Sequence, residues 1–119
     1  RVSGVKVPGT PDLEDMQKLW GDLADQVCFT NYNPWENVYA AEENTIQEAC
    51  TDLWRRMFLW WNGVVNPCDV DYRSTLQVGK FPDNSLSELW NGEAYRRLRM
   101  SHLAALRSRY SPCNRCTVV

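Results

Sequence analysis

Four cysteines in the last seventy residues constrain the fold of this chain more than any other feature. Cys50 and Cys68 are separated by seventeen residues, and Cys113 and Cys116 form a Cys-x-x-Cys pair near the end of the sequence. Thiolates from two separate segments can close one tetrahedral site. Such a site suits an iron–sulfur cluster or a structural zinc ion, and the spacing alone does not choose between them.

The bulk properties narrow the class of protein. The length of 119 residues fits about one ordinary domain, and the net charge of −2 gives no reason to expect nucleic-acid binding. The longest strictly apolar run, residues 57–61, is far shorter than the roughly 20 residues of a membrane span, and no secretory signal opens the chain. An odd number of cysteines argues against a disulfide framework. We therefore expect a reducing, cytoplasmic setting without a membrane partner.

Residues 1–40 predict a strand, a helix and a second strand. Residues 2–7 alternate loosely, Pro11-Asp12 opens a helix, and residues 27–29 form the second apolar stretch. One buried face of the helix is predicted from apolar residues at three-and-four spacing, namely Leu13, Met16, Leu19, Trp20 and Leu23. A single unit of this kind cannot make a stable sheet, so we expect the last piece of a larger α/β domain. The chain also lacks an initiator Met, which predicts an internal piece of a longer protein.

Residues 41–119 predict a second domain of the α+β class. Residues 56–61 and 64–65 read as two strands joined by the favoured hairpin turn Asn62-Gly63, which can bring Cys50 near Cys68. Residues 79–84 read as a loop. The predicted site is therefore surrounded by a β-hairpin and short helices.

Two helices are predicted after this loop. Ser85 and Glu88 have the form of a capping box, and Gly92 ends the short helix that they begin. A longer helix opens at Glu93 and is broken by Ser111-Pro112. Its buried side is predicted to carry Tyr95, Leu98, Leu103 and Leu106.

Several residues near the predicted site have two interpretations. The Arg residues beyond position 55 are densest near the terminal cysteine pair, where they either stabilise an anionic cluster or form a solvated helix face. His102, the only histidine, is expected to pack or to be exposed rather than to bind metal. Asp69 and Asp71 are expected to cap a turn, with substrate binding as the alternative. Cys28 is expected to be a buried core thiol outside the motif, with a distant fifth ligand or a redox role as the alternative.

Beyond spacing, the sequence between the cysteines resembles the SPASM and Twitch auxiliary-cluster domains of radical SAM enzymes. Residues 60–71 (WWNGVVNPCDVD) resemble that family's hairpin, and Val78-Gly79 with residues 85–91 (SLSELWN) resembles its next segment. Residues 95–99 (YRRLR) resemble the helix that follows. The resemblance covers residues 48–119, while residues 1–40 resemble the last strand–helix–strand of a radical SAM barrel.

The resemblance implies an auxiliary [4Fe-4S] cluster held by Cys50, Cys68, Cys113 and Cys116. Because the sequence ends soon after Cys116, it resembles the shorter Twitch type with one cluster. The Cys-x-x-x-Cys-x-x-Cys motif for S-adenosylmethionine and its own [4Fe-4S] cluster is absent, so this piece is not expected to be catalytic alone. The parent would be an oxidoreductase or maturase that acts on a peptide or small molecule. Its partners would be the rest of the barrel and an electron carrier.

Two functions of different classes therefore stand. The first is an auxiliary cluster domain that transfers electrons while a substrate radical is oxidised. The second is a non-enzymatic interaction module that uses the same four cysteines to bind zinc. Cys50 and Cys68 are separated by seventeen residues, whereas zinc sites of this kind usually combine two pairs of closely spaced cysteines.

Overall fold

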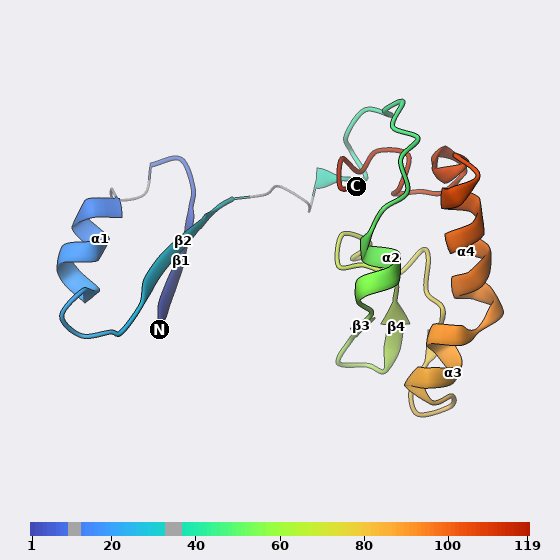
Figure 1. Cartoon of the computed structure of the whole chain (residues 1–119), viewed down its shortest axis with the longest axis horizontal. Helices are drawn as coiled ribbons and strands as arrows, with labels where there is room; N and C mark the ends of the chain where they lie inside the picture. Colours follow the sequence, from blue (N-terminus) through green and yellow to red (C-terminus); the bar gives the residue numbers. More distant parts are fainter. Residues whose placement is uncertain (10–12, 33–36) are drawn as a thin grey trace. The chain divides into compact units, whose positions relative to one another are not determined.

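The computed structural model describes residues 1–9, 13–32 and 37–119, which form two compact units, Arg1–Pro34 and Trp35–Val119 (Figure 1). Helices and small sheets occur together, which confirms the predicted α+β class. The predicted helix start at Pro11-Asp12 lies outside the described residues. No helix in the described ranges is both long enough and apolar enough to cross a membrane.

The first unit is a parallel strand–helix–strand. Strand β1 (Val2–Lys6) pairs with β2 (Val27–Asn31), and helix α1 (Leu13–Trp20) lies on the connection between them. Neighbouring parallel strands need such a crossover connection, because the chain must return to the end of the sheet at which the first strand began before it enters the second. The predicted order of elements is thus present, and its assignment to a barrel stays a prediction.

The second unit contains a three-stranded antiparallel sheet. Strands β3 (Phe58–Leu59) and β4 (Val64–Asn66) form the predicted hairpin, and β5 (Gly79–Lys80) pairs with the other edge of β4. The first strand is shorter than the predicted residues 56–61. The prediction of a loop from residue 79 was wrong at its start, because Gly79 and Lys80 pair with Val65 and Val64.

Three short helices complete the second unit, and the last two follow one another along its side in Figure 1. Helix α2 (Asp52–Arg55) was not predicted, whereas α3 (Leu86–Asn91) and α4 (Glu93–Leu103) were. The predicted capping box is confirmed. The Glu88 N–H donates to Ser85 Oγ at 3.2 Å, and the Ser85 N–H donates to Glu88 Oε2 at 2.8 Å. These bonds satisfy N–H groups that the first helical turn leaves free.

Helix α4 ends well before Ser111-Pro112, which corrects the longer helix predicted from the sequence. Ala105 adopts a positive φ of 58°, and the Leu106 N–H donates to Ser101 O at 2.8 Å, which closes the last turn. The buried stripe is Tyr95, Leu98 and His102, and Leu103 is exposed. The chain then makes a separate 3₁₀ turn, η2 (Arg107–Arg109).

The core of the second unit lies against the cysteine-bearing segments. Leu53, Tyr95 and Leu98 form its buried centre, and Cys50 packs against it. The Tyr95 hydroxyl donates to Arg56 O at 2.8 Å, which ties α4 to the chain entering the hairpin. The buried core and this hydrogen bond therefore hold α4 and the chain between Cys50 and the hairpin in place.

Gly63 offers a direct test of the hairpin turn. Its φ is +85°, and an added Cβ would collide with the Phe81 carbonyl oxygen. We expect Gly63→Ala to lower the free energy of unfolding by at least about 2 kcal/mol, from backbone strain together with the clash. Denaturant unfolding measures this loss. Gly9→Ala is the control, because Gly9 has the same φ with nothing near the added Cβ. Equal losses in the two variants would contradict the predicted clash.

Candidate metal centre

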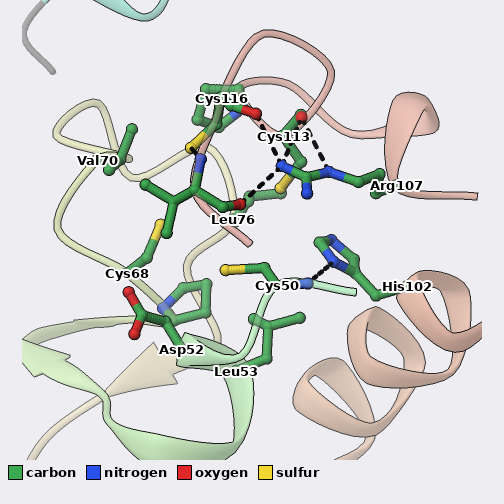
Figure 2. Close-up of a pocket in the computed structure, with 13 residues that line it drawn as sticks. Cys50, Asp52, Leu53, Cys68, Val70, Leu76, His102, Arg107, Cys113 and Cys116 are labelled. Atoms are coloured by element: carbon green, nitrogen blue, oxygen red, sulfur yellow. Dashed lines mark hydrogen bonds between the residues drawn. The ribbon is translucent and has the colours of Figure 1, made fainter. Parts of the chain in front are cut away.

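Four thiols from three segments line one pocket in the second unit. Cys50 precedes α2, Cys68 follows β4, and Cys113 and Cys116 lie in the turn after η2. Figure 2 shows their sulfur atoms around the same space. The structure therefore brings together all four cysteines that the sequence singled out, and their role as metal ligands stays a prediction.

Backbone N–H groups donate to three of the four sulfurs. The N–H of Asp52 donates to Cys50, and the N–H of Asp71 donates to Cys68. The N–H of Val118 donates to Cys116 Sγ at 3.4 Å. Hydrogen bonds of this kind favour the thiolate over the thiol and tune any iron–sulfur centre that the thiolates hold. In each case the donor follows its cysteine by two or three positions, so the local loop conformation provides it.

Burial raises the pKa of Cys50, Cys68 and Cys113 and so keeps these three thiols protonated in the metal-free chain. It raises the pKa of Cys68 and of Cys113 to about 12, with a further rise from neighbouring thiols. Burial also raises the pKa of Cys50, while the Arg107 guanidinium lowers it. A bound metal must therefore displace protons, because only thiolates ligate.

The side chains do not stand ready for a single ion. Across residues 1–9, 13–32 and 37–119, no three Cys, His, Asp or Glu side chains are grouped as a site that could hold a metal ion. A single ion would therefore require the thiols to move into ligating positions, which would couple its binding to the order of the surrounding loops.

Asp71 organises the loop that carries Cys68. Its fully buried carboxylate accepts hydrogen bonds from the Thr75 N–H at 2.9 Å, the Leu76 N–H at 2.7 Å and the Tyr39 hydroxyl. Burial, and then the bond to Asp71, raise the pKa of Tyr39, so the phenol remains a donor. Turn capping, the first of the two predicted roles, is thus what Asp71 does. Asp69 makes no such bond to any residue that the structure describes.

Arg107 organises the loop that carries the terminal pair. The side chain is only 1 % exposed. Its guanidinium donates to the carbonyl oxygens of Cys116 at 2.8 Å, Val118 at 3.2 Å and Cys113 at 3.3 Å, and of Glu48 at 3.0 Å. The prediction of a solvated Arg face was wrong for this residue, because it leaves the helix and turns into the pocket lining.

His102 supports Cys50 from α4. It is buried, and its Nδ1 accepts a hydrogen bond from the Cys50 N–H at 3.2 Å, while its Nε2 has no partner in the described structure. Burial, with repulsion from Arg107, lowers the pKa of His102 to about 4. The ring is therefore neutral at physiological pH, and packing is its role, as predicted.

Cys28 lies in the first unit, on β2, and does not line the pocket. It is half-buried rather than fully buried, and its sulfur accepts a hydrogen bond from Arg1 Nε at 3.3 Å. The buried role of Arg107 was missed from the sequence, as was the hydrogen bond between His102 and the Cys50 backbone. The one available signal was the excess of Arg near Cys113, which points to a charge partner without saying which Arg is buried.

A small α+β domain whose separate loops present four thiols to one pocket has the features of a thiolate metal-binding domain. Comparisons with known proteins agree. Residues 50–117 match the SPASM iron–sulfur cluster-binding domain, which is more than half of the chain. The chain therefore belongs to the SPASM family of iron–sulfur cluster-binding domains, which confirms the SPASM domain predicted from the sequence.

The fold is similar to that of BtrN, in a crystal structure of its open conformation. The TM-score is 0.64 at 15 % sequence identity, and the match covers 98 % of this chain and 45 % of BtrN. The chain thus spans less than half the length of that protein. No curated protein matches the sequence.

Proposed function

We propose that Cys50, Cys68, Cys113 and Cys116 hold one auxiliary [4Fe-4S] cluster, as in the Twitch type, and that this cluster transfers electrons in a radical SAM enzyme. The observation that carries the proposal is the convergence of the four thiols on one pocket. Family membership adds that the domain binds an iron–sulfur cluster.

The donor set and its surroundings fit such a group. Thiolates are the ligands that iron–sulfur clusters take, and three of these sulfurs already accept backbone N–H bonds. Apolar side chains make up much of the rest of the lining, and these are Leu53, Pro67, Val70, Leu76, Pro112 and Val118. A dry, apolar shell limits solvent access and thereby sets the reduction potential.

Four protein ligands favour electron transfer over direct binding of substrate. When bound, the cluster would supply one-electron redox chemistry. The chain's own residues would hold it, exclude water and donate hydrogen bonds to its sulfur ligands. In the parent enzyme we expect a barrel with the S-adenosylmethionine cluster, a peptide or small-molecule substrate and an electron carrier as partners, with the first unit as part of that barrel.

Anaerobic reconstitution with iron and sulfide tests the proposal. We expect about four iron and four sulfide per chain, broad visible absorbance and bleaching on reduction. A colourless protein that takes up no iron but binds one zinc tightly would overturn it and support the zinc module instead. A cluster that no reductant bleaches would leave cluster binding intact and refute the electron-transfer role.

A further inference from the structure

Arg107 is a buried cation without a carboxylate partner in the described structure. It is the largest fully buried side chain in the described ranges, and each of its hydrogen-bond acceptors is a neutral backbone carbonyl. The ion pairs recorded there are Lys18–Asp15, Arg56–Asp52 and Arg115–Glu43. Asp52 also lines the pocket, and its carboxylate is already paired with Arg56 at 3.1 Å.

A buried positive charge of this kind destabilises the folded chain unless negative charge nearby compensates it. Removing a guanidinium from water is unfavourable, and carbonyl dipoles offset only part of that cost. Its guanidinium contacts the carbonyl oxygens of Cys113 and Cys116 and lines the pocket, so the charge lies within the loop that carries two of the pocket sulfurs. The cation is thus placed to stabilise negative charge that develops among the pocket sulfurs.

The other polar groups at the pocket do not compete for this role. The Nδ1 of His102 accepts a hydrogen bond from the Cys50 N–H and so holds the Cys50 backbone. The backbone donors to Cys50, Cys68 and Cys116 carry no net charge. Arg107 is therefore the fixed positive charge in the lining, and the group that fits it is an anionic tetrathiolate centre.

We propose that Arg107 is a positioning residue that serves as the counter-charge of the iron–sulfur cluster. Its fork of hydrogen bonds orders the loop that carries Cys113 and Cys116, and its charge holds the cluster and raises its reduction potential. This inference rests on the proposed cluster binding and adds to it the residue that sets the electrostatics of the site. Reduction adds one negative charge to the centre, and a nearby cation stabilises the reduced state more than the oxidised state.

Two substitutions separate charge from shape. Arg107→Gln removes the charge and keeps an amide donor, whereas Arg107→Lys keeps the charge and loses the planar fork. Arg96→Gln is the matched control, because Arg96 is an exposed arginine on α4. Each full-length chain is reconstituted anaerobically, and the midpoint potential is measured by redox titration with EPR detection.

We expect the midpoint potential to shift to more negative values in Arg107→Gln and to stay near that of the unsubstituted chain in Arg107→Lys and Arg96→Gln. The rise in melting temperature on cluster loading should also shrink in Arg107→Gln and persist in Arg107→Lys. An unchanged potential in Arg107→Gln, or an equal shift in both Arg107 variants, would overturn the counter-charge role.

Other outcomes are equally decisive. Where Arg107→Gln holds no cluster, occupancy replaces the potential as the readout. Recovery of iron in Arg107→Lys then supports the role of charge, and a Lys variant as empty as the Gln variant refutes it. If the unsubstituted chain itself takes up no cluster, the proposed function fails together with this inference. A loaded chain that is insensitive to Arg107 refutes the inference alone.

Discussion

Cys68→Ser should lose more than about half of the iron that the unsubstituted chain binds on anaerobic reconstitution, because three thiolates cannot close a four-ligand site. Cys68 occupies the end of the hairpin and faces the pocket with the other three thiols. The melting temperature of the loaded protein should fall as well, since ligation contributes to folding. Iron analysis and thermal unfolding measure the two effects.

Cys28→Ser is the control for this substitution. Cys28 belongs to the other unit of the chain, so its loss should leave the iron content unchanged. Serine at position 50, 113 or 116 should reproduce the effect of Cys68→Ser. The ligand assignment would be refuted by a Cys68→Ser chain with full iron content and an unaltered melting temperature.

Asp71→Ala should cause the largest loss of stability in the metal-free protein. The substitution removes the acceptor of the Thr75 N–H, the Leu76 N–H and the Tyr39 hydroxyl. The three hydrogen bonds are part-buried, and a donor that stays shielded from water without a partner costs about 1–3 kcal/mol. The sum, roughly 3–5 kcal/mol after partial rehydration, is a large part of the stability of an ordinary domain. Denaturant unfolding followed by tryptophan fluorescence measures it.

Graded variants make the Asp71 prediction specific. Asp71→Asn keeps one carbonyl acceptor and should lose less than Asp71→Ala. Asp69→Ala, in the same loop, should change little. Because the Asp71 carboxylate orders the loop that carries Cys68, the Asp71→Ala chain should also retain its cluster poorly. If Asp69→Ala destabilised the chain as much as Asp71→Ala, the loop would not depend on these bonds.

The sequence predicted those elements whose signals are local. Asn62-Gly63 marks a hairpin because the turn needs a residue with positive φ, and Gly63 has it. Ser85 and Glu88 mark a helix start because their reciprocal bonds involve only neighbours. The strand–helix–strand of the first unit was likewise predicted from local patterns, namely loose alternation in the first strand and three-and-four apolar spacing in the helix.

Elements that depend on distant partners were missed. Helix α2 has four residues, too few to show a helical period, and it is fixed by Leu53 in the core. Strand β5 has two residues without apolar alternation, and it exists because the edge of β4 offers backbone partners. The end of α4 depends on the αL conformation of Ala105. The sequence did not indicate it, because the residue in this conformation at a helix end is usually glycine rather than alanine.

The candidate site divides in the same way. Cysteine spacing indicated which four thiols meet, because metal ligation needs those residue types at those separations. It could not indicate that Arg107 would turn inward, since an arginine near a helix end is usually exposed. That outcome is decided by four carbonyls from two segments that converge only in the folded chain.

The most direct test is a crystal structure of the anaerobically loaded protein with anomalous diffraction data collected at the iron edge. We expect a single iron peak within the pocket, bonded to the sulfurs of Cys50, Cys68, Cys113 and Cys116. An iron peak elsewhere, or a well-ordered pocket in which the Cys50 or Cys68 sulfur points away from the metal, would contradict a single centre shared by the four thiolates.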